Sequence, residues 1–139
     1  MRLTVIIDTN VIYSGLNSKR GASYKLLEIL PENKFDIAVS VPMVLEYESV
    51  LKRSIKHLSK AEIDDFIDYL CTISRHIEIF YLWRPALKDP TDDMVLELAI
   101  TANAKYVITY NIKDFQIAEH YGIKPITPND FLKKIGVIK

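Results

Sequence analysis

The sequence predicts a single α/β domain built on a mostly parallel β-sheet with helices on both faces. Short apolar segments rich in β-branched residues alternate along the chain with segments whose apolar residues recur at helical spacing. The strand segments are nearly continuously apolar, which is typical of parallel strands buried on both faces. No repeat, low-complexity tract or Ser/Gly-rich linker interrupts residues 1–139, so we expect one domain.

The first half of the chain predicts two strand–helix units. Residues 3–7 are an apolar, β-branched strand segment, and residues 24–30 carry leucines at helical spacing. Residues 35–39 form a second strand segment. Pro42 then suits the first turn of a helix that runs to about Lys52, because the missing N–H of proline costs nothing there.

The second half continues the same alternation. Ser59 and Glu62 have the spacing of a capping box, which predicts the start of a long helix. Residues 77–82 then predict a strand, residues 92–102 a helix and residues 106–109 another strand.

The last segment predicts a short helix over residues 114–120, a strand over residues 123–126 and a terminal helix. Thr127 suits the N-cap of that terminal helix, with Pro128 at its first position. These elements complete the pattern expected of a sheet covered on both faces.

The charge balance excludes a globally basic nucleic-acid binder. Lys plus Arg and Asp plus Glu both count 18, so attraction to a polyanion must come from local patches. The longest apolar runs fall far short of the ~20 residues that a membrane-spanning helix needs, and no signal segment opens the chain. We therefore expect a cytoplasmic protein with no membrane association.

Polar residues follow two of the predicted strands directly. Asp8 ends the first strand and is followed by Thr9 and Asn10, while residues 109–111 and Asp114 follow a later apolar strand. Ligands of parallel sheets gather beyond the carboxyl ends of the strands, so these residues are candidates for a site. The alternative for Asp8 and Thr9 is a purely structural helix cap.

Two further groups of acids are candidates. Asp89, Asp92 and Asp93 crowd the start of a predicted helix, where capping requires only one acid, and such crowding favours a site for a hard metal ion. Glu46 and Glu48 border the apolar face of the helix that begins near Pro42 on opposite sides. Helical periodicity cannot choose between these two glutamates, and either one can simply be solvated.

Several other classes of chemistry lose support. There is no phosphate-binding loop and no Cys or His cluster with zinc spacing, and the serines have no evident His and Asp partners. A phosphatase-like domain with Asp8 as nucleophile stays open as an alternative, although no second acid follows two residues later.

The motifs together resemble those of the PIN-domain nucleases, particularly the toxins of VapBC-like toxin–antitoxin systems. The resemblance is carried, in order along almost the whole chain, by residues 6–11, 42–46, 89–93 and 107–115. The family fold is a parallel sheet between helices, so the expected fold class becomes a PIN-like α/β/α domain.

The resemblance implies that Asp8, Glu46 and Asp93 are the catalytic, metal-binding acids. It therefore selects Glu46 over Glu48. Members often carry a fourth acid at the position that Asn111 occupies here, and the expected substitute for this acid at a second metal site is Asp114.

The implied activity is an endoribonuclease that uses Mg²⁺ or Mn²⁺ to activate water against an RNA phosphodiester. Carboxylate ligands suit these hard ions. Neutral and acidic neighbours would orient the ligands or contact the scissile phosphate; these are Thr9, Asn10, Asp89, Asp92, Thr109 and Asn111.

Expected partners are RNA, a small antitoxin protein and a second copy of the chain. Lys52, Arg53 and Lys56 form the densest basic stretch and are candidates for RNA contact, although a solvated helix end explains them equally well. The homodimer rests on the family resemblance and on the apolar, aromatic residues 80–83. The remaining alternative is a catalytically inactive PIN-like module that binds RNA or protein, which Asn111 permits.

Overall fold

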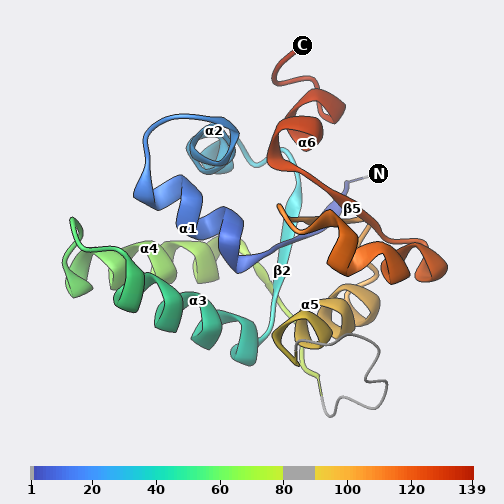
Figure 1. Cartoon of the computed structure of the whole chain (residues 1–139), viewed down its shortest axis with the longest axis horizontal. Coiled ribbons are helices and arrows are strands. Elements are labelled where there is room, and N and C mark those ends of the chain that lie inside the picture. Colours follow the sequence, from blue (N-terminus) through green and yellow to red (C-terminus); the bar gives the residue numbers. More distant parts are fainter. Residues whose placement is uncertain (1, 80–89) are drawn as a thin grey trace.

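A computed structural model of the chain describes residues 2–79 and 90–139, and within them five parallel strands form one sheet (Figure 1). The strands lie in the order β3-β2-β1-β4-β5. Their bounds are β1 Thr4–Ile7, β2 Asp36–Val39, β3 Arg75–His76, β4 Tyr106–Ile108 and β5 Lys124–Ile126. The predicted strands in both halves of the chain are confirmed, apart from the bounds of β3.

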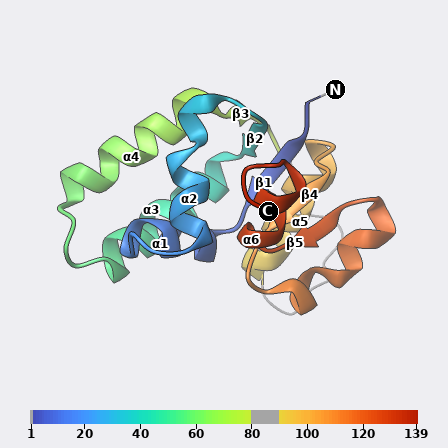
Figure 2. The ribbon, with the colours of Figure 1, turned by 90° about the horizontal axis from the view of Figure 1, so that it is seen from above.

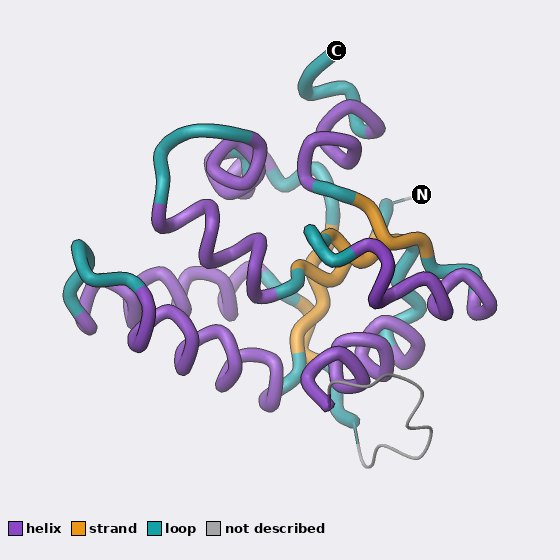
Figure 3. The backbone as a smooth tube through the Cα atoms, viewed as in Figure 1, coloured by secondary structure: helices purple, strands orange, loops and turns teal. Residues whose placement is uncertain are grey.

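Helices cover both faces of this sheet, which confirms the predicted α/β/α class. The helices are α1 Thr9–Asn17, α2 Ala22–Glu28, α3 Val41–Ser54, α4 Lys60–Ile73, α5 Pro90–Thr101 and α6 Pro128–Lys134, with 3-10 segments η1 Leu30–Glu32 and η2 Ile112–Tyr121. Viewed from above, α1 to α4 lie on one side of β1 while α5 and η2 lie on the other (Figure 2). The tube in Figure 3 shows short strands at the centre with helices around them.

The central strand explains why its sequence is so apolar. Val5, Ile6 and Ile7 in β1 have no exposed surface, because β2 and β4 pair with the strand edges and helices cover its faces. Parallel strands with both faces covered need this continuous apolar character. Helices α1 and α3 follow β1 and β2 directly, so their first turns lie at the carboxyl edge of the sheet.

The helix that follows β1 begins at Thr9, as the polar end of that strand suggested. It packs closely on α2: a Cβ at Gly15 would lie 2.6 Å from Leu27 Cδ1 and 2.9 Å from the carbonyl oxygen of Ser23. A side chain at Gly15 would therefore push α2 away from α1.

The predicted strand over residues 77–82 is wrong at its start. Strand β3 comprises Arg75 and His76, which pair with Ala38 and Val39, and Ile77 donates its N–H to the carbonyl of Val39 over 2.8 Å. Beyond Val39 the neighbouring chain turns into α3, so the pairing with β2 ends at this point. Residues 80–83, which carried part of the homodimer prediction, lie outside the described residues.

The predicted helix caps are confirmed. Ser59 Oγ accepts the N–H of Glu62 over 3.0 Å, and the Glu62 carboxylate accepts the N–H of Ser59 over 2.9 Å. These hydrogen bonds to Ser59 hold the pKa of Glu62 below its usual value. Thr127 caps α6 in the same way, accepting the N–H of Asp130 over 3.1 Å. Within residues 2–79 and 90–139, no helix is long and apolar enough to cross a membrane.

Candidate active site

Asp8 lies at the carboxyl end of the central strand and is held from two directions. The residue is only 5% exposed. Oδ1 accepts the N–H of Thr9 over 2.8 Å, which caps α1, and Oδ2 accepts the hydroxyl of Thr109 over 2.8 Å. A helix cap needs only the first of these bonds, so the second indicates a carboxylate whose orientation matters beyond capping.

Thr109 connects Asp8 to the loop that follows β4. The residue is fully buried, and its N–H donates to the carbonyl of Ile126 in β5 over 2.9 Å. Its hydroxyl donates to Asp8 and accepts the N–H of Asn111 over 2.9 Å. The expected proximity of the two strand ends is confirmed, and one hydroxyl fixes both the acid and the following loop.

Asn10 and a tyrosine–serine pair join this network. Asn10 Oδ1 accepts the N–H of Tyr110 at 3.5 Å, a long hydrogen bond. The Tyr110 hydroxyl is hydrogen-bonded to Ser23, which is buried on α2, while the tyrosine as a whole remains 46% exposed. Nothing in the sequence pattern links Ser23 to Tyr110, because the two residues lie 87 positions apart.

Tyr47 is a second residue that the sequence did not mark as part of the site. It is fully buried on α3, and its hydroxyl donates to the carbonyl oxygen of Ile7, immediately before Asp8. Burial, followed by the negative charge of Asp8, raises the pKa of Tyr47 well above its usual range, so its proton stays in place. The bond fixes α3, and with it the backbone of Glu46, against β1.

The two glutamates of α3 have different surroundings. Glu48 forms an ion pair with Lys52 over 3.1 Å, and the same ammonium lies 2.7 Å from Asp64 on α4. These two acids raise the pKa of Lys52. Glu46 is half-buried and has no hydrogen bond or ion pair within the described part of the chain. Glu48 therefore has a structural role between helices, while the carboxylate of Glu46 is uncommitted.

The remaining candidates are placed as follows. Asp92 and Asp93 are half-buried in the first turn of α5, and both interact with neighbouring groups. Asp114 is exposed at the start of η2, where its N–H donates to the carbonyl of Asn111 over 3.1 Å. Asp89 lies outside the described residues.

The basic stretch lies away from this edge of the sheet. Lys52 and Arg53 are in the last turn of α3, and Lys56 follows the helix, with its ammonium donating to the carbonyl of Arg53 over 2.9 Å. Since α3 begins at the carboxyl edge and each residue advances a helix by about 1.5 Å, these cations lie roughly 15–20 Å along its axis from that edge.

The donor set suits a divalent ion in its chemistry, but the described side chains do not form a gathered metal centre. Among residues 2–79 and 90–139, no three His, Cys, Asp or Glu side chains lie in an arrangement that could hold a metal ion. The acids nevertheless provide the oxygen ligands that Mg²⁺ and Mn²⁺ prefer. Beside Asp8, the buried hydroxyl of Thr9 has no hydrogen-bond partner among the residues that the structure describes. A buried polar group of this kind indicates a place for a bound ligand or its hydration shell.

We expect Thr9→Val to leave the ligand-free fold as stable as the parent, or stabilise it by up to about 1 kcal/mol. The substitution removes a buried hydroxyl that makes no hydrogen bond, so nothing is lost when the shape is kept. Urea unfolding without divalent ions measures this difference, with Ser23→Ala as a control that removes a hydrogen-bonded buried hydroxyl. A loss of more than 1 kcal/mol for Thr9→Val would show that the hydroxyl is already satisfied.

The fold and the strand-end acid define a class of protein: a parallel α/β domain with a polar site at the carboxyl edge of its sheet. A family model described as "PIN domain" matches residues 4–113, which is most of the chain. The chain therefore belongs to the PIN-domain family, the nuclease family that its strand-end motifs resemble.

Solved structures share this fold at low sequence identity. The chain resembles VapBC2 from Rickettsia felis, bound to a DNA fragment from its promoter, with a TM-score of 0.62 at 21% identity over 88% of this chain and 98% of that one. It also resembles VapBC-1 from nontypeable Haemophilus influenzae, with a TM-score of 0.62 at 17% identity over 91% of this chain and 99% of that one. A search of curated protein sequences finds no significant match.

Proposed function

We propose that the chain is a divalent-metal-dependent endoribonuclease and the toxin component of a cytoplasmic toxin–antitoxin system. The observation that carries the proposal is the buried carboxylate of Asp8, oriented by Thr109 at the carboxyl edge of a PIN-family sheet. A buried acid that is held by a second residue is typical of a metal ligand whose geometry must be fixed.

In this proposal Asp8, Glu46 and Asp93 bind Mg²⁺ or Mn²⁺. Asp114 is a further ligand, which replaces the fourth acid that many family members carry at the position of Asn111. A bound ion would supply positive charge to the scissile phosphate and a water of lowered pKa. Thr109 keeps Asp8 in one orientation through its hydrogen bond, and Tyr47 keeps α3 against β1. The contribution of the chain is thus mainly the position of its carboxylates.

The polar neighbours of these acids would hold the substrate. Asn10 lies in the first turn of α1 and accepts the N–H of Tyr110, while Asn111 lies in the loop after β4 that Thr109 holds, so their amides are suited to contacts with a phosphate oxygen. Thr9, Asp89 and Asp92 would act on the ligating acids rather than on RNA. Arg53 and Lys56 are exposed, which suits contact with more distant phosphates, whereas Lys52 is held by Glu48 and Asp64.

The proposed protein partner is a small antitoxin. The two solved structures described above, which share this fold, are VapBC proteins, and this supports an antitoxin for this chain as well. An antitoxin arginine would pair with the carboxylates of the site, because guanidinium and carboxylate groups form strong bidentate bonds. A homodimer is also proposed, and a monomeric mass in solution across micromolar concentrations would count against it.

The test is RNA cleavage by the purified chain with Mg²⁺, with Mn²⁺ and with a chelator, using two matched variants. Glu46→Gln should reduce metal-dependent cleavage ~100-fold or more through loss of a ligand, since even changes to groups behind the ligands cost 10- to 100-fold. Glu48→Gln removes the same charge two residues away. This variant should retain cleavage activity, because the carboxylate of Glu48 forms an ion pair with Lys52 and is not a proposed metal ligand.

Other outcomes would reject the proposal in distinct ways. RNA binding without cleavage would support the inactive module, and an acyl phosphate on Asp8 would support the phosphatase-like alternative. RNA cleavage that continues in the presence of the chelator would reject metal dependence. RNA cleavage by the purified chain, without a growth defect when the chain is expressed alone in a bacterial host, would reject the toxin role but not the nuclease activity.

A further inference from the structure

The amino edge of the sheet, opposite the candidate active site, gathers positive charge. Arg2 precedes β1, Arg75 begins β3, Lys105 precedes β4 and Lys124 begins β5, while β2 begins with the acid Asp36. The backbone hydrogen bonds from Lys105 N to Thr4 O (2.8 Å) and from Lys124 N to Lys105 O (2.9 Å) place these strand starts side by side.

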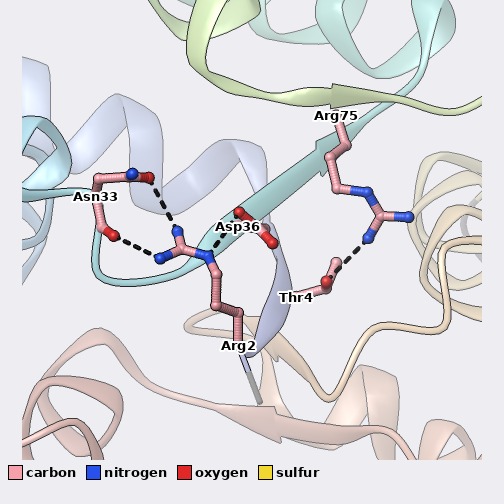
Figure 4. Close-up of polar contacts among 5 residues, drawn as sticks. All are labelled: Arg2, Thr4, Asn33, Asp36 and Arg75. Atoms are coloured by element: carbon pink, nitrogen blue, oxygen red, sulfur yellow. Dashed lines mark hydrogen bonds and ion pairs between the residues drawn. The ribbon is translucent and has the colours of Figure 1, made fainter.

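Arg2 and Asp36 neutralise each other. Arg2 Nε lies 3.1 Å from Asp36 Oδ1, and its two terminal nitrogens donate to the carbonyl and side-chain oxygens of Asn33 over 2.7 and 2.9 Å (Figure 4). Asn33 has the left-handed backbone conformation, with φ of 55°, which turns its oxygens toward the guanidinium. Neither charge of this pair is available to a ligand.

Arg75 and Lys105 have no such neutralising partner in the described part of the chain. Arg75 extends from β3 toward β1, where one of its terminal nitrogens donates to the hydroxyl of Thr4 over 3.0 Å (Figure 4). That neutral contact orients the guanidinium without compensating its charge. Lys105 is exposed and forms no ion pair with any described residue. Arg75 and Lys105 are therefore two uncompensated cations of this edge.

These cations line one cavity of about 530 Å³. Its walls include Arg2, Thr4, Arg75, Asn103, Lys105 and Tyr121, and no acidic residue among those that the structure describes lines it. The volume falls in the range of sites for small molecules. Tyr121 is 46% exposed and adds an aromatic surface of the kind on which nucleobases stack.

We propose that this amino-edge cavity binds the terminal phosphate of a nucleotide, either free or at the end of an RNA chain. A phosphate monoester carries a charge of about −1.5 to −2 at neutral pH, which matches the two uncompensated cations, whereas an internal phosphodiester carries one charge. Arg75 can bind phosphate oxygens in a bidentate manner. Four residues of β1 separate this edge from Asp8, or roughly 13 Å, so the two sites are distinct.

The test is an amide-shift NMR titration at pH 7.5 with a chelator present, which prevents metal-dependent cleavage. The probes are AMP, adenosine, and a short oligoribonucleotide with a 5′-phosphate or a 5′-hydroxyl. AMP should shift the amides of residues 103–105 and Gly122 saturably. Arg75→Gln and Lys105→Gln should each raise the Kd about tenfold, the equivalent of one charge-assisted hydrogen bond. Lys133→Gln, which removes an exposed charge on α6, should leave the Kd unchanged.

The titration shows whether the cavity binds a terminal phosphate and also which kind of molecule carries that phosphate. Saturation by AMP alone supports a free nucleotide, and saturation by the 5′-phosphorylated oligonucleotide supports an RNA end. Equal affinity for adenosine and AMP, or for the 5′-hydroxyl and 5′-phosphate oligonucleotides, would overturn the proposal. Non-saturable shifts spread over all surface lysines would overturn it too. None of these measurements requires RNA cleavage. The proposed phosphate site is therefore tested independently of the proposed nuclease activity.

Discussion

Asp93→Asn is expected to abolish metal-dependent RNA cleavage and to leave the metal-free fold within about 1 kcal/mol of the parent. The residue is half-buried in the first turn of α5, where it interacts with neighbouring groups and the helix dipole favours a carboxylate by about 0.3–1 kcal/mol. The amide keeps the shape of the side chain and removes the charge that a hard cation needs. Loss of activity should therefore be separable from loss of stability.

Thermal unfolding with and without Mn²⁺ measures this separation. At 100 times its Kd, a ligand that binds only the folded state adds about 2.7 kcal/mol, so Mn²⁺ should raise the Tm of the parent and raise that of Asp93→Asn much less. Asp92→Asn is the matched control, since it changes the adjacent acid in the same turn. Full cleavage by Asp93→Asn, with activity lost in Asp92→Asn instead, would transfer the metal-ligand role to Asp92.

Thr109→Val should produce the largest loss of stability among single substitutions at the site, about 2–4 kcal/mol. The fully buried hydroxyl donates to Asp8 and accepts the N–H of Asn111, so valine removes one partner from each. An unsatisfied buried group costs about 1–3 kcal/mol, and more when it is charged. Asp8 would also lose the bond that fixes its orientation, so cleavage should fall together with stability.

Urea unfolding of Thr109→Val and Thr109→Ser separates the contribution of the Thr109 hydroxyl to stability from the contribution of its methyl group. Serine keeps the donor and acceptor and loses only a methyl group, which costs about 1 kcal/mol. We expect the serine variant to keep most of the cleavage activity. Equal destabilisation by both substitutions would indicate that the methyl group, and not the bond to Asp8, is what Thr109 contributes.

Much of the fold was predictable because periodicity and end signals agree in the same segments. The apolar strand of residues 3–7 ends at Asp8, and the capping box at Ser59 starts α4 where the pattern placed it. Strand β3 was not predictable from composition, because Arg75 and His76 are polar and become a strand only by pairing with the end of β2. Tertiary pairing overrides local preference at such a short edge strand.

The site was predictable where it depends on strand ends and not where it depends on packing. The proximity of Asp8 and Thr109 follows from adjacent parallel strands. The different surroundings of Glu46 and Glu48 do not follow from periodicity, because only the packing of α4 brings Asp64 to Lys52. The bond from Tyr47 to the carbonyl of Ile7 also requires α3 to lie against β1.

The hydrogen bond between Asp8 and Thr109 joins residues 101 positions apart, and this separation governs when the site can form during synthesis. Strand β1 can pair with β2 early, but its other neighbour, β4, is among the later parts of the chain to be made. At a synthesis rate of about 5–20 residues per second, roughly 5–20 seconds pass between Asp8 and Thr109. Pairings of such long range also slow folding itself. A nascent chain that has not reached Thr109 has the acid without the hydroxyl that orients it, so catalytic competence would begin only after most of the domain has been translated.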